Sequence, residues 1–178
     1  MIQDISESVK GFHFREFGSI VYLIKLDLEN ILIDTSSKEN SIELLNFLKT
    51  QDLNPEDITT VILTHAHYDH VQNIDLFPKA KIYGNFTKII NEDHSQTEIE
   101  NILPIENLLL EGFEILKLPG HTPGDIAILY KNILFSGDVV FHGGYIGRND
   151  FPESDEKEQQ KSLKKLNNVK FDILCPGH

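Results

Sequence analysis

A cluster of three histidines and one aspartate constrains this chain more than any other feature of its sequence. Residues 64–70 read THAHYDH and directly follow the apolar, β-branched run 59–63. That run is short and comes after the turn-forming pair Asn54-Pro55, so it predicts a buried strand. A strand that ends in polar side chains carries them to the rim of a sheet, where they converge. The chain has eight histidines in 178 residues, which argues against a chance cluster.

The residue types in this cluster indicate a metal site. Imidazole nitrogens and carboxylate oxygens together suit zinc, iron or manganese, and the cluster has no thiolate, which argues against a closed structural zinc site. Similar residues end three later strand-like runs beside glycine: His121 in the turn PGHTPG, Asp138 after FSG, and His178 after CPG. Glycine lets the backbone approach a shared centre closely. Asp34 ends an earlier run and is either a turn former or a residue that orients a ligand.

Composition narrows the function classes. The formal charge of −12 repels phosphate backbones and anionic membranes, which disfavours nucleic acid and membrane partners. The single cysteine, Cys175, excludes an intramolecular disulfide and fits a reducing compartment. The amino terminus lacks the pattern of a signal peptide, so we expect a cytoplasmic protein. The length predicts a single domain over 1–178 and leaves the oligomeric state open.

Hydrophobic periodicity predicts two strand-rich halves, each followed by helices. The strand-like runs are 11–17, 19–26, 31–33, 59–63, 81–83, 108–110, 113–118, 126–130, 133–135 and 171–174. The helical patterns are 41–50, 71–77, a segment around 86–90, and one that starts in the polar stretch 152–160. Cap spacings occur at Asn40 with Glu43 and at Asp155 with Glu158. This order favours an α/β architecture of two mixed sheets packed face to face, with helices outside.

The chain as a whole resembles the metallo-β-lactamase superfamily. The similarity rests on the HxHxDH signature at 65–70 and on His121, Asp138, His178 and the early Asp34. It implies a four-layer αββα sandwich with the site on one edge. It also implies two divalent ions, the first held by His65, His67 and His121, the second by Asp69, His70 and His178, and both bridged by Asp138.

The resemblance implies a hydrolytic chemistry on a small-molecule substrate. A hydroxide that bridges two divalent cations has its pKa pulled toward about 7, which provides a nucleophile at neutral pH. Asp69 would orient the hydroxide, and Asp138 would hold both ions. Zinc is the favoured metal, with iron or manganese as alternatives. Cys175 is expected to be a small buried strand residue and not a nucleophile.

A glycine-rich loop after Asp138 is expected to line the substrate cleft. Residues 147–152 resemble the GRTDFP-type loop of glyoxalase II-like hydrolases and of persulfide dioxygenases, with Asn149 in place of threonine. In one interpretation Arg148 and Asp150 pair with each other. In the other, Arg148, Tyr145 or His142 contacts an anionic thioester. His94 is expected to be a solvated surface residue.

Three hypotheses about function therefore remain. The first is a binuclear metal-dependent hydrolase of the glyoxalase II-like branch that acts on a thioester or an ester. Glutathione is a doubtful leaving group, because glyoxalase II enzymes bind it largely through a helical domain that this sequence lacks. The alternative is a mononuclear iron persulfide dioxygenase with His65, His121 and Asp138 as ligands. A catalytically idle, metal-stabilised binding module is the third.

Overall fold

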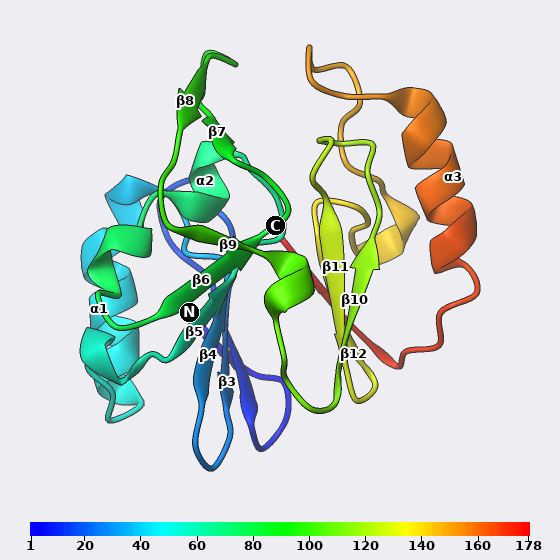
Figure 1. The fold of residues 1–178 in the computed structure, drawn as a ribbon. Helices are drawn as coiled ribbons and strands as arrows, with labels where there is room; N and C mark the ends of the chain where they lie inside the picture. Colours follow the sequence, from blue (N-terminus) through cyan, green and yellow to red (C-terminus); the bar gives the residue numbers. More distant parts are fainter.

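Two β-sheets lie face to face at the centre of the molecule, and helices cover their outer faces, as the computed structural model of residues 1–178 shows (Figure 1). The larger sheet lies on the side of α1 (Ser41–Thr50), and the smaller sheet lies on the side of α3 (Glu156–Leu166). The predicted αββα sandwich is therefore confirmed. No helix is long and apolar enough to cross a lipid bilayer.

The larger sheet has seven strands in the order β1-β2-β3-β4-β5-β6-β9. The strands are β1 (Ile2–Asp4), β2 (Val9–Phe12), β3 (Val21–Lys25), β4 (Asn30–Ile33), β5 (Thr60–Ile62), β6 (Lys81–Gly84) and β9 (Ile102–Pro104). The strands β1 to β4 pair antiparallel, whereas β4, β5, β6 and β9 run parallel to one another. The sheet is therefore mixed, and its parallel strands end at the same edge.

The smaller sheet has four strands in the order β10-β11-β12-β13. They are β10 (Phe113–Lys117), β11 (Ile126–Tyr130), β12 (Ile133–Gly137) and β13 (Ile173–Pro176). The first three form an antiparallel meander, and β13 runs parallel to β12. A separate hairpin consists of β7 (Lys88–Ile90) and β8 (Gln96–Glu98). Short helices complete the fold: η1 (Lys38–Asn40), η2 (Pro55–Asp57), α2 (Tyr68–Val71), η3 (Ile74–Leu76), η4 (Ile105–Asn107) and η5 (His142–Gly144).

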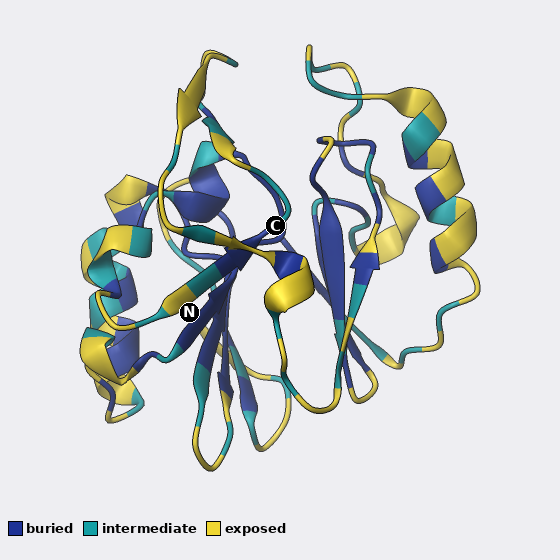
Figure 2. Cartoon of the chain, viewed as in Figure 1, coloured by how far each residue is buried: buried dark blue, intermediate teal, exposed yellow.

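Strand alternation divides the apolar side chains between the layers. In β4, Ile31 and Ile33 face the second sheet, while Leu32 faces α1. The same alternation in β11 and β12 sends Ile128 and Phe135 to the interface between the sheets. The inner strands are accordingly buried and the helices are exposed on their outer sides (Figure 2). Each such buried aliphatic side chain contributes about 1.5–3 kcal/mol to folding, so the sandwich is a rigid base for its loops.

Three predicted elements are wrong. The strand-like run 11–17 is a strand only at its start, because β2 ends at Phe12 and residues 13–18 are irregular. The segment around 86–90 is the strand β7 and not a helix: its Ile90 N–H donates to Ala66 O at 2.9 Å, and it pairs with β8. The predicted strand 108–110 is irregular, with Leu109 exposed to solvent, because the chain forms β9 and η4 just before it. For the segment around 86–90, the short apolar run has a periodicity that fits helix and strand equally, and tertiary pairing decides.

One of the two predicted helix caps is present and the other is not. Asp155 caps α3 as predicted, since its carboxylate accepts hydrogen bonds from Lys157 N and Glu158 N. Asn40 makes no such bond to α1; its amide instead donates to Phe17 O at 3.2 Å. The helix α1 covers the sheet with a buried face formed by Leu44, Phe47 and Leu48, while Ile42 is exposed.

Candidate metal centre

The predicted ligand residues lie on loops that leave both sheets at one edge. Asp34 follows β4, residues 65–70 follow β5, Asp138 follows β12 and His178 follows β13. These strands form two parallel pairs, and parallel strands deliver the residues after their carboxyl ends to a common edge. His121 comes from the loop between the antiparallel strands β10 and β11. The two sheets thus contribute to a single cluster.

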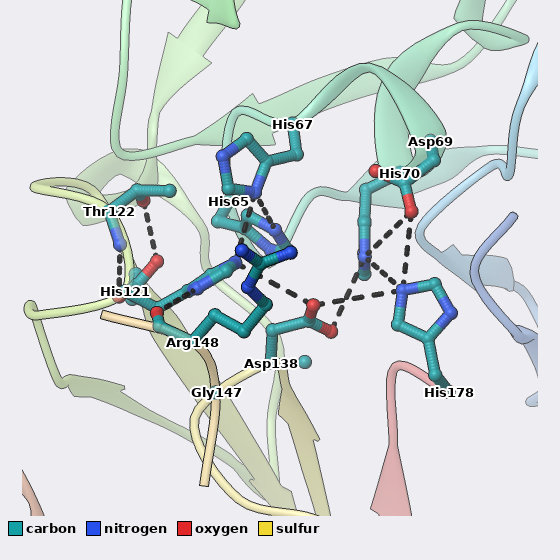
Figure 3. A network of polar contacts seen from close by, with 12 residues as sticks. His65, His67, Asp69, His70, His121, Thr122, Asp138, Gly147, Arg148 and His178 are labelled. Atoms are coloured by element: carbon teal, nitrogen blue, oxygen red, sulfur yellow. Dashed lines mark hydrogen bonds and ion pairs between the residues drawn. The ribbon is translucent and has the colours of Figure 1, made fainter. Parts of the chain in front are cut away.

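Three histidines form the first trio, which consists of His65, His67 and His121. Their ring nitrogens point at one another (Figure 3). His67 Nδ1 lies 3.0 Å from His65 Nε2 and 2.9 Å from His121 Nε2. All three residues are buried, and each offers one nitrogen to a group of atoms that lie within 4.8 Å of one another. One cation placed among them is within reach of all three nitrogens.

The second trio consists of Asp69, His70 and His178. His178 Nε2 lies 3.2 Å from Asp69 Oδ2 and 3.4 Å from His70 Nε2 (Figure 3). Asp69 and His70 are buried, whereas 31% of the His178 side chain is exposed. Their ligand atoms also fall within 4.8 Å of one another.

Asp138 lies between the two trios. Its Oδ1 is 3.4 Å from His70 Nε2, and its Oδ2 is 3.6 Å from both His121 Nε2 and His178 Nε2. Burial would raise the pKa of this carboxyl, but His70 and the other histidines outweigh it and hold the pKa below its ordinary range. Oδ1 is buried with no hydrogen-bond partner. An ionised oxygen left in that state costs about 1–3 kcal/mol or more, which a cation on either side would offset.

The hydrogen bonds on the outer side of the first trio determine which ring nitrogens carry protons. His67 Nε2 lies 2.7 Å from Glu153 Oε1, and His121 Nδ1 lies 2.7 Å from Arg148 O. Both acceptors take an N–H, so the nitrogens that face each other across 2.9 Å are lone pairs in the neutral rings. Burial lowers the pKa of His67, which disfavours a proton there. Converging lone pairs fit a metal ion.

Asp34 is hydrogen-bonded to one residue of the second trio directly and to one of the first trio through Thr64. Its Oδ2 accepts hydrogen bonds from His70 Nδ1 and from Thr64 Oγ1, both at 2.8 Å. Thr64 Oγ1 in turn accepts from His65 Nδ1 at 3.1 Å, since its own proton goes to Asp34. One buried carboxylate therefore fixes the ring orientation of a histidine in each trio. Its backbone has a φ of 59°, an unfavourable conformation for a residue with a side chain, of the kind that concentrates at functional sites.

Close backbone approach requires glycine beside Asp138. A Cβ atom on Gly177 would lie 2.2 Å from Asp138 Oδ1, and one on Gly147 would lie 1.9 Å from Asp138 O. Both distances are far below van der Waals contact. The glycines that flank the predicted ligands thus make room for the cluster, in agreement with the sequence argument.

Glu153 and His94 belong to the site but were not predicted for it. Glu153 Oε1 accepts from His67 Nε2 and also lies 3.1 Å from His94 Nδ1, and the Glu153 side chain is only 5% exposed. The prediction of His94 as a solvated surface residue is therefore wrong. The β7-β8 hairpin brings it over the cluster, because Ile90 is hydrogen-bonded to Ala66 O. Glu153 lies 86 positions from His67, so no local pattern identifies it.

A cleft of about 480 Å³ opens above the two trios. Its lining includes Phe17, Tyr68, Asn91, Glu92, Phe141, Ile146, Arg148 and Phe151, together with cluster residues. Arg148 donates from Nε and Nη2 to the two carboxylate oxygens of Asp150, at 2.9 and 2.8 Å. Of the two interpretations of this loop, the structure has the one in which the two residues pair.

Two of the predicted substrate contacts lie away from this cleft. Neither Tyr145 nor His142 lines it; Tyr145 is exposed, and His142 borders a separate cavity beside Cys175. The turn η5, with Gly143 at a φ of 78°, reverses the chain there and displaces both residues from the opening.

Cys175 is buried in β13, and burial raises the pKa of its thiol to about 12. A thiol of this kind is almost entirely protonated at neutral pH and is not a nucleophile. The sequence prediction for Cys175 agrees with this environment.

Comparison with known proteins places these observations in a family. The profile of the Metallo-beta-lactamase superfamily matches residues 15–178. The chain is 31% identical to Metallo-beta-lactamase domain-containing protein 1 of Xenopus laevis, over all of this chain and 77% of that protein. It is 36% identical to hydroxyacylglutathione hydrolase GloC of Haemophilus influenzae, over 76% of this chain and 74% of that protein.

A solved structure supports the same assignment. The crystal structure of TTHA1623 in a di-iron-bound form superposes with a TM-score of 0.73 and 27% identity, over 90% of this chain and 87% of that one. Together with the αββα sandwich and the His/Asp cluster at its edge, these matches show that the chain belongs to the metallo-β-lactamase superfamily.

Proposed function

We propose that this protein is a binuclear metal-dependent hydrolase that cleaves a thioester or an ester, with zinc as its metal. The observation that carries the proposal is the pair of trios with Asp138 between them. In this proposal the first trio holds one ion, the second trio holds the other, and Asp138 is shared. The name of the di-iron neighbour and that of the hydroxyacylglutathione hydrolase relative are consistent with two ions and a thioester substrate.

The two ions, when bound, would acidify a water molecule and polarise the substrate carbonyl. The chain's own residues direct that reaction. Asp69 and Asp138 both border the cleft, so they are placed to accept hydrogen bonds from the attacking water and fix its direction. The water oxygen bonds to the carbonyl carbon, the bond to the thiol or alcohol breaks, and the leaving group takes up a proton.

Asp34 and Glu153 act through the histidines in this proposal. By accepting N–H protons on the outer side, they keep the inner nitrogens of His70 and His67 free to bind metal. They are positioning residues and do not touch substrate. The buried setting of both carboxylates strengthens these hydrogen bonds relative to bulk water.

The test is elemental analysis combined with a turnover assay, on protein purified without chelators. About two zinc ions per chain and hydrolysis of acyl thioesters without oxygen consumption would support the proposal. One iron per chain, with oxygen consumed on addition of a persulfide, would overturn it in favour of the dioxygenase, for which His65, His121 and Asp138 would be the ligands. Turnover of neither substrate class would contradict both hydrolase and dioxygenase.

A further inference from the structure

The opening of the cleft carries apolar side chains that the fold does not bury. Phe17 is 66% exposed and stacks on the ring of His178, with centroids 5.5 Å apart and planes inclined by 17°. Ile146 is also exposed at the rim. Phe151 lines the same cleft beside the first trio, with its ring centroid 5.6 Å from that of His67. Contiguous apolar surface around a reactive centre indicates a binding face for an apolar group.

The single lysine or arginine of the same cleft is paired with a carboxylate of the protein. Arg148 is the sole lysine or arginine among its lining residues. One edge of its guanidinium, Nε and Nη2, donates to Asp150, and its flat face lies over Phe151 at 4.4 Å. The carboxylate of Asp150 offsets the positive charge of Arg148, so the pair has no net charge with which to attract an anionic substrate.

The remaining charges at the opening are unfavourable for anions. Glu92 lines the cleft, and its neighbour Asp93 lies in an adjoining hollow with Glu39. His94 faces Glu153, so it is committed to a carboxylate of the protein. The formal charge of −12 adds a long-range potential of the same sign. Away from the metal cluster, then, a charged substrate tail meets carboxylates and aromatic rings.

From these contacts we propose that the substrate is an ester or thioester with an apolar alkyl or aryl acyl group and an uncharged leaving group. The acyl group would lie on the shelf formed by Phe17, Phe141, Ile146 and Phe151. This inference rests on the proposed hydrolase function and narrows it. It disfavours glutathione thioesters, because glutathione has a net negative charge at pH 7.

The first experiment compares two thioesters of one neutral thiol, N-acetylcysteamine, whose acyl chains have equal length. One chain ends in a phenyl group and the other in a sulfonate, which coordinates metals weakly. The enzymatic rate for each thioester is divided by its rate of alkaline hydrolysis, which corrects for the different intrinsic reactivities of the two compounds. We expect kcat/KM to favour the phenyl compound by at least about tenfold, mainly through KM. Equal or better turnover of the sulfonate would overturn the inference.

Substitutions in the cleft test which residues cause the preference for the phenyl compound. Phe17→Ala should reduce the preference several-fold. Leu28→Ala removes an apolar side chain that is even more exposed, at 91% against 66%, from a distant turn and should leave the preference unchanged. Asp150→Asn releases Arg148 and should raise turnover of the sulfonate compound. Glu114→Gln makes the same change in net charge on the exposed side of β10 and should not. Equal effects of each variant and its control would contradict the assignment of the shelf.

A binding assay separates failure of this inference from failure of the proposed function. Methyl ketones with a phenyl or a sulfonate end resemble the two acyl chains but cannot be hydrolysed. Their binding to the metal-loaded protein is followed by saturation-transfer NMR. Tighter binding of the phenyl ketone without turnover of any thioester would mean that the hydrolase proposal is wrong while the preference of the cleft stands. Tighter binding of the sulfonate ketone, or no binding of the phenyl ketone, would overturn the preference whatever the turnover.

Discussion

The two trios of the metal centre have similar ligand types but are held very differently. Each ring of the first trio has its outer nitrogen bonded to a partner: Thr64 for His65, Glu153 for His67 and the Arg148 carbonyl for His121. In the second trio only His70 has such a support, in Asp34. His178 is partly exposed and is oriented by stacking on Phe17.

This difference predicts unequal affinity for metal. A hydrogen bond to the outer nitrogen fixes the tautomer and the ring orientation, so less entropy is lost when the inner nitrogen binds an ion. A partly exposed ring without that support loses more. We therefore expect the first trio to bind its ion before the second and more tightly. Asp138, which faces both trios, should couple them.

Removal of the shared residue should have the largest effect. Asp138→Ala is expected to lower kcat/KM by at least about a thousandfold, because both positions lose a ligand and the buried histidines lose their anion. Elemental analysis should show that the content of both ions per chain is reduced. Asp75→Ala, an exposed aspartate in η3, provides the control and should retain both. Full metal content in Asp138→Ala would show that this carboxylate is not a ligand.

Two single substitutions, one in each trio, should then distinguish the affinities of the two metal positions. His178→Ala is expected to leave one tightly bound ion per chain, because the first trio and its supports are intact. His121→Ala should abolish the tight site and leave weak binding only. Titration of each variant against a chromophoric chelator measures both affinities. The same loss in both variants would remove the distinction between the trios.

Weakening the hydrogen bond that Glu153 accepts from His67 should have a smaller effect on metal binding. Glu153→Gln replaces a carboxylate acceptor by a weaker amide, so the first ion should bind about 10–100-fold less tightly while the second is unchanged. Circular dichroism should show an unaltered fold, and Glu156→Gln, an exposed residue at the start of α3, serves as the matched control. If the weaker ion were the one affected, Glu153 would not support the first trio.

The smallest effect concerns the strand that carries His178. Cys175 lies in β13 with a pKa raised to about 12 by burial, so only about one thiol in ten thousand is ionised at pH 8. Iodoacetamide should therefore modify the native protein very slowly and the unfolded protein readily, with the native rate rising as the pH approaches 12. Rapid labelling at pH 8 would mean that the end of β13 opens locally. The backbone that carries His178 would then be mobile, in addition to its partly exposed side chain.

Sequence and structure agree best where the signal is local. The cluster at 65–70 and the ligand types beside glycine at His121, Asp138 and His178 are visible as short patterns, and the structure brings them together. Strand alternation likewise predicts the two sheets. What could not be predicted depends on contacts between distant segments. Glu153 reaches His67 across 86 positions, and β7 becomes a strand because Ile90 pairs beside Ala66.

The central claim is that two ions bind unequally at two trios that share Asp138. The most direct measurement is a zinc titration of the metal-depleted, refolded chain with a competing chelator, with elemental analysis of the loaded protein. We predict two zinc equivalents per chain with two separable affinities, the tighter one weakened by Glu153→Gln. A single equivalent, or a single iron ion retained in place of zinc, would contradict the account.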